Sequence, residues 1–84
     1  MYYTYVLQSE KDQKFYTGST KDLKQRLKEH NSGRMPATRN RGPLKLIYCE
    51  ICINGKDARE REMYLKTAWG KRYIKNRLRN YLTG

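Results

Sequence analysis

The spacing of apolar residues in this chain alternates between the period of a strand and the period of a helix, and this alternation constrains the fold most. Three short segments are rich in β-branched and aromatic residues, which favour strands: 2–8, 15–19 and 44–53. Helical spacing marks three further segments: one ending near residue 31, one at about 56–68, and one after Gly70. The sequence therefore predicts an α+β fold of order β-β-α-β-α-α, with a three-stranded, mostly antiparallel sheet flanked by three helices.

The same spacing predicts which residues face the core. The third strand alternates at period two, and we expect its core face to consist of Ile47, Cys49, Ile51 and Ile53. The core stripe of the second helix is expected to contain Ala58, Leu65 and Trp69. Gly70 is expected to interrupt the helix directly after this stripe.

Small and polar residues mark the ends of the first helix. Ser19 or Thr20 is expected to cap its N-terminus, with Asp22 in the first turn near the positive end of the helix dipole. Gly33 is expected to end the helix. Gly18 stands where the second strand meets this helix, and glycine there permits close approach of the backbone to a packed helix or to a ligand.

The length of the chain limits it to one domain, which we place at residues 1–84. A domain of this size buries only roughly 60% of the surface that its unfolded chain exposes. No apolar run approaches the ~20 residues that a membrane helix requires. The N-terminal residues lack the basic region and cleavage site of a signal peptide, so we expect a cytoplasmic protein.

The charge of the chain points to a polyanionic partner. Lys and Arg number 19 against 8 acids, a formal net charge of +11, and such a field attracts nucleic acid. No acid follows Glu62, and a second basic group lies in the polar middle of the chain. The predicted nucleic-acid-binding residues are Arg34, Arg39, Arg41, Lys66, Lys71 and Arg72. A merely soluble basic surface stays an alternative, and the absence of a strongly apolar outer helix face disfavours a membrane-surface role.

Cys49 and Cys52 have the C-x-x-C spacing of some zinc and redox sites. No second pair or histidine cluster accompanies them, and an offset of three in a strand points two side chains to opposite faces. The spacing therefore disfavours a zinc or redox role, and two free cysteines fit a reducing compartment.

The tyrosine content suggests a chemical role for some of these residues. The chain contains eight Tyr and one Phe, although a core needs aromatic area rather than hydroxyls, which must find partners when buried. Tyr3 and Tyr5 share one face of the first predicted strand, and Tyr16 lies on the next strand. Ordinary half-buried strand tyrosines remain the alternative.

Arg26 and His30 lie four residues apart in the first predicted helix and therefore on one face. They form either a solvated pair or a phosphate-binding pair, and His30, with an unperturbed pKa of about 6.5, could act as a general base.

Glu62 lies on the predicted apolar stripe of the second helix, four residues after Ala58. A carboxylate there costs free energy unless it is paired or binds a metal. It could form a salt bridge or hold Mg²⁺, which prefers few carboxylates together with water and phosphate. One carboxylate suits a site with one metal ion better than a site with two.

Together these residues resemble the GIY-YIG nuclease superfamily, in particular its small single-domain branch and the nuclease domain of excinuclease C. Residues 3–5 (Tyr-Thr-Tyr) correspond to the first motif and residues 16–18 (Tyr-Thr-Gly) to the second. The first helix of the family matches residues 21–33, and its metal-binding helix matches residues 57–66. Tyr3 replaces the glycine of the first motif, and threonines replace both isoleucines. A later asparagine of the family aligns only loosely with Asn76.

The resemblance implies a metal-dependent endonuclease that cleaves DNA, in the manner of DNA-repair nucleases. The implied catalytic residues are Tyr5, Tyr16, Arg26, His30 and Glu62. Glu62 would hold one Mg²⁺ or Mn²⁺ ion, and Arg26 would neutralise the scissile phosphate. Which of Tyr5, Tyr16 and His30 is the general base stays open.

We expect low sequence specificity, with a preference for single-stranded or structured DNA, because phosphate contacts carry no sequence information. Two alternatives are a non-catalytic nucleic-acid-binding module of the same fold and a basic structural protein.

Overall fold

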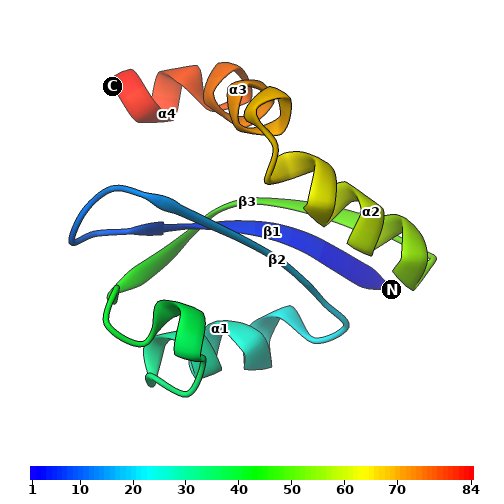
Figure 1. Cartoon of the computed structure of the whole chain (residues 1–84), viewed down its shortest axis with the longest axis horizontal. Helices are drawn as coiled ribbons and strands as arrows, with labels where there is room; N and C mark the ends of the chain where they lie inside the picture. The colour runs from blue at the N-terminus through cyan, green and yellow to red at the C-terminus, as the bar shows by residue number, and fades with distance from the viewer.

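The three strands form one antiparallel sheet with β1 in the middle (Figure 1). The computed structural model describes residues 1–84. β1 (Tyr2–Ser9) pairs with β2 (Phe15–Thr20) on one side and with β3 (Leu44–Cys52) on the other, which gives the order β2-β1-β3. β2 is therefore an edge strand, and one side of it is free of strand pairing.

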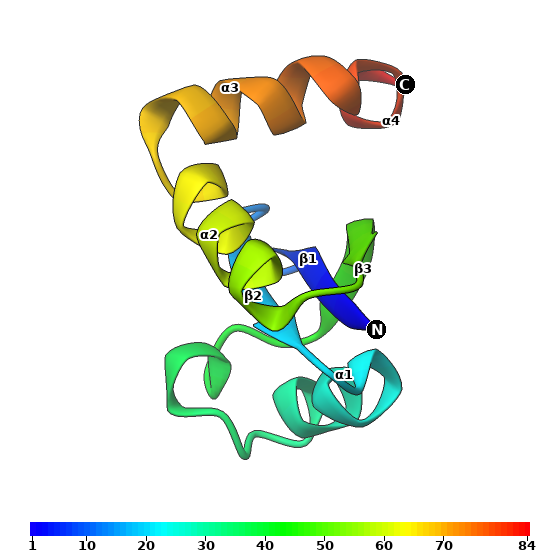
Figure 2. The ribbon, with the colours of Figure 1, turned by 90° about the vertical axis from the view of Figure 1, so that its right-hand side faces the viewer.

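Helices cover both faces of the sheet (Figures 1 and 2). α1 (Leu23–Asn31) lies on one face, and the helices after β3 lie on the other: α2 (Gly55–Leu65), α3 (Ala68–Arg77) and the short α4 (Arg79–Thr83). A 3-10 turn, η1 (Pro36–Thr38), lies between α1 and β3. The predicted order β-β-α-β-α-α is confirmed, with the last predicted helix divided into α3 and α4. None of the helices combines the length and apolar composition needed to cross a bilayer.

Each face of the sheet has its own small core. On the α1 face, Tyr5 and Leu7 are buried and pack against leucines of α1. On the opposite face, Val6 packs with Leu65 of α2 and Ile74 of α3. Because side chains alternate along a strand, three consecutive residues of β1 serve two cores. One of these residues is a tyrosine, so the core on the α1 face contains a hydroxyl that needs a partner.

A β-bulge in β3 changes which residues point to each core. Val6 pairs with Tyr48, but Leu7, the next residue, pairs with Leu46. Ile47 is therefore an extra residue on β3, and such an insertion breaks the strict alternation of faces.

The predicted core face of β3 is wrong for its last two residues. Ile47 packs on the α2 and α3 face, beside the bulge. Ile51 pairs with Tyr3, which shares the face of Tyr5 and therefore lies on the α1 side of the sheet. Ile51 is 60% exposed, and Ile53, which follows the end of β3, is 87% exposed, so neither residue belongs to a core.

The junction of α2 and α3 lies at Thr67 rather than at Gly70. Thr67 caps α3 by accepting a hydrogen bond from the backbone N–H of Gly70 (3.2 Å), so the predicted break at Gly70 is wrong. A Cβ at Gly70 would lie 2.1 Å from the backbone oxygen of Tyr64, and only glycine fits where the two helices meet. The new helix phase buries Ile74 and leaves Trp69 68% exposed, so the predicted core position of Trp69 is also wrong.

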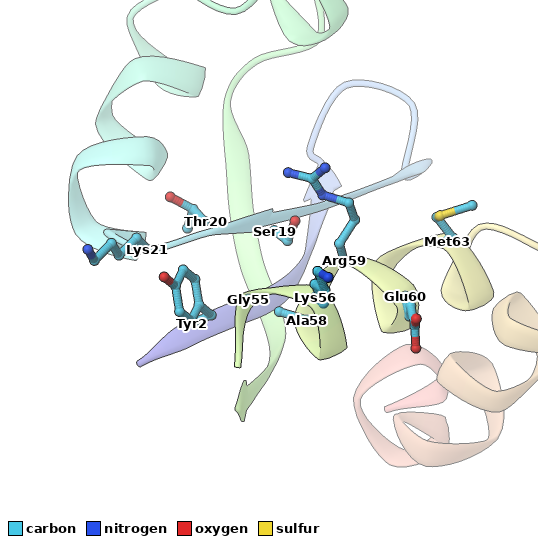
Figure 3. Close-up of a pocket in the computed structure, with 10 residues that line it drawn as sticks. All are labelled: Tyr2, Ser19, Thr20, Lys21, Gly55, Lys56, Ala58, Arg59, Glu60 and Met63. Atoms are coloured by element: carbon cyan, nitrogen blue, oxygen red, sulfur yellow. The ribbon is translucent and has the colours of Figure 1, made fainter. Parts of the chain in front are cut away.

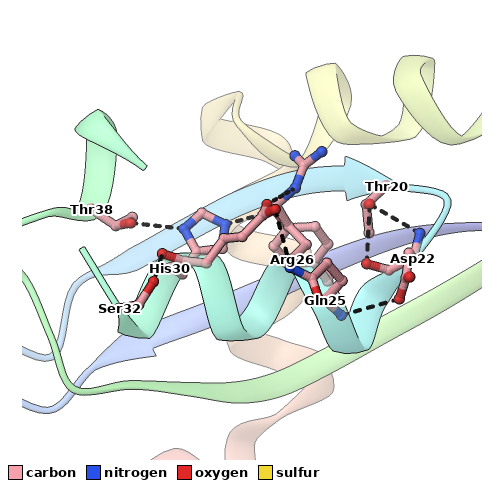
Figure 4. A network of polar contacts seen from close by, with 9 residues as sticks. Thr20, Asp22, Gln25, Arg26, His30, Ser32 and Thr38 are labelled. Carbon is pink, nitrogen blue, oxygen red and sulfur yellow. Dashed lines mark hydrogen bonds and ion pairs between the residues drawn. The ribbon is translucent and has the colours of Figure 1, made fainter. Parts of the chain in front are cut away.

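Asp22 caps α1, with its carboxylate accepting a hydrogen bond from the backbone N–H of Gln25 (3.1 Å) (Figure 4). The predicted caps Ser19 and Thr20 are wrong because both residues still belong to β2. Thr20 instead orients the cap, since its hydroxyl accepts a hydrogen bond from the backbone N–H of Asp22 (3.1 Å). Gly33, with φ of +80°, follows the C-cap of α1, which confirms the predicted stop.

Candidate active site

The five residues that the sequence predicts as catalytic come from four different elements. Tyr5 lies on β1, Tyr16 on β2, Arg26 and His30 on α1, and Glu62 on α2. They converge beside the edge strand β2, which runs between α1 on one face of the sheet and α2 on the other (Figure 2). The structure therefore brings together side chains that are up to 57 positions apart in the chain, as 62 − 5 = 57.

A chain of hydrogen bonds through His30 forms the buried side of the site (Figure 4). The hydroxyl of Tyr5 lies 2.9 Å from Nε2 of His30, and the hydroxyl of Thr38 lies 2.7 Å from Nδ1. All three residues are at most 1% exposed. The ring of Tyr16 contacts the same imidazole edge-on, with ring centroids 4.9 Å apart. Both nitrogens of His30 are thus satisfied within the protein, as a buried imidazole requires.

Thr38 is a member of this chain that the sequence did not reveal. It lies on η1, inside a polar loop without periodicity, and no local pattern marks it. Only the return of the loop over α1 places its hydroxyl beside the imidazole.

The environment keeps both titratable members of the chain uncharged near neutral pH. Burial, reinforced by the neighbouring Tyr16, raises the pKa of Tyr5 to about 12. The Arg26 guanidinium opposes that rise and the Glu62 carboxylate adds to it. Burial and the positive charge of Arg26 lower the pKa of His30, and Glu29 partly offsets this. Tyr5 therefore keeps its proton and the imidazole stays neutral.

Glu62 forms the opposite, partly exposed side of the site. Its side chain is 19% exposed, and one carboxylate oxygen accepts a hydrogen bond from the Ser19 hydroxyl of β2 (2.5 Å). The other oxygen lies 2.7 Å from Nζ of Lys66, one turn further along. The salt bridge considered as an alternative for Glu62 is therefore present. It involves a lysine that is 51% exposed, and such i,i+4 pairs contribute only about 0.3–0.5 kcal/mol.

Arg26 contributes a partly exposed guanidinium. Its Nε lies 3.2 Å from the Glu29 carboxylate, and its side chain is 35% exposed. The guanidinium also lies close enough to the Tyr5 hydroxyl to lower the pKa of that phenol by charge and hydrogen bonding. A guanidinium in this state can bind a phosphate with two parallel hydrogen bonds.

Gly18 is explained by packing against a side chain. It pairs with Tyr5 across β1 and β2, and a Cβ at this position would lie 2.5 Å from the Tyr5 hydroxyl. The absence of a side chain thus lets the Tyr5 ring lie across β2 and reach His30.

The donor set around Glu62 restricts which metal could bind. The structure contains no group of three His, Cys, Asp or Glu side chains that could hold an ion. An ion here would have one carboxylate and would depend on water and a ligand phosphate for its other oxygens, as Mg²⁺ does. Cys49 and Cys52 are free, and burial, with a smaller contribution from Glu50, raises the pKa of Cys49, which disfavours thiolate chemistry.

Comparison with known proteins agrees with this arrangement. The family described as the GIY-YIG catalytic domain matches residues 1–75. The chain belongs to the GIY-YIG family. The matched range includes all five predicted catalytic residues, so the family match and the convergence at β2 concern the same part of the molecule.

Curated relatives of this GIY-YIG chain are UPF0213 proteins of bacteria. A UPF0213 protein of Clostridium perfringens is 46% identical over 67 residues, covering 79% of this chain and 71% of its own length. One from Pediococcus acidilactici is 40% identical over 84 residues, covering 89% of this chain and 82% of its own. The solution NMR structure of a UPF0213 protein from Bacillus halodurans has a TM-score of 0.54 and 32% identity, covering 88% of this chain and 82% of that one.

The predicted nucleic-acid-binding residues of this GIY-YIG chain divide into two groups. Lys66 and Lys71 line a cleft beside Tyr16, and Arg41 joins Lys71 in the adjoining cleft at the start of β2. The others lie elsewhere: the guanidinium of Arg72 stacks over the exposed Trp69 ring (5.0 Å), and Arg34 and Arg39 are exposed on the loop around η1.

A third cleft adjoins the opposite end of β2 and was not predicted (Figure 3). Its lining includes Ser19 and Thr20 of β2, Lys21 after β2, and Lys56 and Arg59 of α2. Arg59 precedes Glu62 by three residues and therefore lies on an adjoining part of the helix surface. This spacing was the one feature of the sequence that could have indicated the cleft.

Proposed function

We propose that this chain is a metal-dependent endonuclease that hydrolyses phosphodiester bonds in DNA with low sequence specificity. One observation carries the proposal: the half-buried Glu62 carboxylate of α2 accepts a hydrogen bond from Ser19 on β2, the edge strand that carries Tyr16, and both Glu62 and the Arg26 guanidinium lie close enough to Tyr5 to shift its pKa. A phosphodiester with a cation bound to it would meet both an acidic and a basic group there. The family match implies a nucleic-acid substrate and supports the same reading.

Glu62 is the residue that would hold the divalent ion, Mg²⁺ or Mn²⁺. The donor chemistry fits, because Oε2 already lies against a cation, the Lys66 ammonium, and Oε1 is oriented by the Ser19 hydroxyl. When bound, such an ion would supply positive charge to the scissile phosphate and the leaving oxygen. Lys66 would leave Oε2 for a phosphate, since its side chain is flexible and half-exposed.

Arg26 would neutralise the non-bridging phosphate oxygens. Its Nε lies 3.2 Å from the Glu29 carboxylate, and this ion pair orients the planar guanidinium before a phosphate binds. Charge that develops on phosphate oxygens during hydrolysis is stabilised most by donors that are in place beforehand.

Tyr16 is the residue that would contact the attacking water. Of the three candidate bases, it alone reaches solvent, because Tyr5 and His30 are both 1% exposed. Both nitrogens of His30 are engaged, and the raised pKa of Tyr5 keeps that phenol protonated. Tyr5 and His30 therefore act as positioning residues that hold the Tyr16 ring through the edge contact with the imidazole.

A non-catalytic DNA-binding module is the second candidate, and the Lys66–Glu62 ion pair favours it. If the ammonium stays on the carboxylate, Glu62 is neutralised within the protein and needs no metal. The basic clefts around β2 would then bind DNA without cleaving it.

Nicking of supercoiled plasmid separates the two candidates. We expect wild-type protein to nick in Mg²⁺ or Mn²⁺ and not in EDTA. Glu62→Gln, which keeps the size and removes the charge, should lose at least about 10²-fold in rate, as loss of a key charge-stabilising group does. Glu10→Gln, a change of the same charge on an exposed residue of the β1–β2 turn, is the control and should cut normally.

The same assay on single-stranded, duplex, flap and RNA substrates would identify the substrate form. Equal cutting by wild type and Glu62→Gln, or none by either in every metal, contradicts the nuclease assignment. Retained DNA binding without cutting would then favour the binding module.

A further inference from the structure

Seven Lys and Arg side chains line two clefts at opposite ends of β2. The Thr20-end cleft is lined by Lys21, Lys56 and Arg59, with the hydroxyls of Ser19 and Thr20 (Figure 3). The Phe15-end cleft is lined by Lys14, Arg41, Lys71 and Lys75. A smaller cleft that contains Tyr16 and Lys66 shares Phe15 and Lys71 with the Phe15-end cleft and so connects it to the reaction centre.

These seven cations have no ion-pair partner in the protein. The ion pairs of the whole chain are Arg26–Glu29, Arg61–Glu50 and Lys66–Glu62, and none involves a cation of either cleft. Glu60 is the one acid that lines the Thr20-end cleft, and no acid lines the Phe15-end cleft. Both ends of β2 therefore present positive charge that a polyanion can neutralise.

The reaction centre lies between the two clefts on the same strand. Ser19, which holds Glu62, belongs to the lining of the Thr20-end cleft, and Tyr16 follows Phe15 of the other cleft. The six residues of β2 span about 20 Å at ~3.3 Å per residue. One strand of duplex DNA carries a phosphate about every 3.4 Å along the axis, so about five or six phosphates cover this length.

We infer that the nucleic-acid strand runs along β2, with phosphates on one side of the scissile bond in the Thr20-end cleft and phosphates on the other side in the Phe15-end cleft. This inference rests on the proposed function, and it adds the path and the extent of the substrate. It also accounts for cleavage within a strand rather than at its ends, because a bond near an end would lose the contacts of one cleft.

A polyphosphate fits this surface better than an acidic peptide does. An edge strand could pair with a peptide, but a peptide strand would be held through backbone groups of β2. The cations instead lie beyond both ends of the strand and on the helices beside it, where they can follow a backbone that carries charge at each repeat.

Three triple variants test the path without cleavage. The first is Lys21→Gln/Lys56→Gln/Arg59→Gln and the second is Lys14→Gln/Lys71→Gln/Lys75→Gln. The control, Lys28→Gln/Arg77→Gln/Arg79→Gln, removes the same charge from exposed residues outside both clefts. Binding of a 20-base-pair duplex is measured in EDTA, over a range of salt concentrations, on a Glu62→Gln background. Thermal unfolding checks that each variant folds.

The expected result is a decrease in salt dependence for each cleft variant. Each lost phosphate contact should lower the slope of log K against log salt by about 0.9, so three lost contacts lower it by about 2.7. The control variant should change the slope by less than about 0.9, the value that corresponds to one phosphate contact. If the control variant lowers the slope as much as the cleft variants do, DNA binding depends on the overall positive charge rather than on the two clefts, and the inference is overturned.

Single methylphosphonate substitutions locate the contacts along the strand. We expect two groups of sensitive positions, one on each side of the scissile bond, and each cleft variant should abolish one group only. If wild type cuts DNA but the sensitive positions lie on one side, the inference fails and the nuclease proposal stands. If wild type never cuts but two groups flank the centre of the bound region, the nuclease proposal fails and the path stands. Competition by polyglutamate equal to that by DNA of the same charge, with no sensitive phosphate, would favour a peptide ligand and overturn the inference.

Discussion

The α1 side of the reaction centre is buried and uncharged, whereas the α2 side is charged and open. Tyr5, His30 and Thr38 satisfy one another's hydrogen bonds at 1% exposure or less. Glu62 and Lys66 carry opposite charges and reach solvent. Groups whose hydrogen bonds are all made within the protein can position other groups but cannot bind a ligand. Charged groups that reach solvent can exchange their partners for a ligand when it binds. This difference supports the proposal that Tyr5, His30 and Thr38 position the groups that carry out the chemistry at the edge of β2.

The largest expected effect comes from Arg26, which lies between the two sides. Arg26→Gln should lower the rate of DNA cleavage by about 10²–10³-fold, because the charge that faces the phosphate is lost. Arg26→Lys should recover only part of this, since an ammonium lacks the two-pronged geometry. Single-turnover cleavage measures the rate. Unfolding in urea should show a change within about 0.5 kcal/mol, as for an exposed ion pair, and a much larger loss of stability would make Arg26 structural.

Thr38→Val tests whether the buried chain needs each of its members. The change keeps the shape but leaves Nδ1 of His30 without a partner, so the free energy of unfolding should fall by about 1–3 kcal/mol. Thr83→Val, which removes an exposed hydroxyl of α4, is the control and should stay within about 0.5 kcal/mol of wild type. An unchanged stability in Thr38→Val would show that the chain of hydrogen bonds is dispensable.

The pH dependence of stability should report on His30, the one histidine of the chain. Its pKa is lowered in the folded protein, chiefly by burial, so the unfolded chain binds a proton first as the pH falls. Stability should therefore decrease as the pH drops below about 6.5, with a slope of at most about 1.4 kcal/mol per pH unit. Urea unfolding between pH 5 and 7 measures it. His30→Gln should flatten the curve above pH 5, and a curve that keeps its slope in this variant would assign the effect to other groups.

Lys66→Met should have the smallest effect on stability, and it tests whether Lys66 competes with a metal ion for Glu62. Its ion pair with Glu62 is half-exposed, so the free energy of unfolding should change by less than about 0.5 kcal/mol. Removal of the ammonium frees Oε2, and the affinity for Mn²⁺, measured by calorimetry without DNA, should rise several-fold. An unchanged or weaker affinity would indicate that Lys66 does not compete with a metal at Glu62.

The candidate catalytic residues were predicted from the resemblance to the GIY-YIG superfamily, and local patterns single out three of them. Arg26 and His30 share a helix face through their i,i+4 spacing, and Glu62 stands out as an acid on an apolar stripe. The structure places these residues beside Tyr5 and Tyr16. Their chemical roles stay predictions until the variants above are measured.

The wrong predictions for the core face of β3 and for Trp69 have one physical origin. In each, the direction in which the side chains point changes along the element, and the change depends on contacts with residues distant in the chain. The bulge at Ile47 arises from pairing with β1 and places Ile47 on the opposite face of the sheet from Cys49, although the sequence predicts one shared face. α3 starts anew after the Thr67 cap instead of continuing α2, and this change of phase exposes Trp69. Neither the bulge in β3 nor the start of α3 follows from a local pattern, because the apolar residues around each keep the spacing of one continuous strand or helix.

The sequence by itself determined the order of strands and helices and the basic character, since these depend on neighbouring positions and on composition, and its resemblance to the GIY-YIG superfamily supplied the candidate catalytic residues. Only the tertiary structure decided which candidate catalytic residues are buried and which are exposed to solvent. The long connection after α1 returns Thr38 to His30, where its hydroxyl lies beside Nδ1 of the buried imidazole. β2 at the sheet edge leaves Tyr16 and Glu62 partly exposed between two basic clefts. Burial and ion pairing depend on residues distant in the chain, and such distances are fixed by packing rather than by spacing along the sequence.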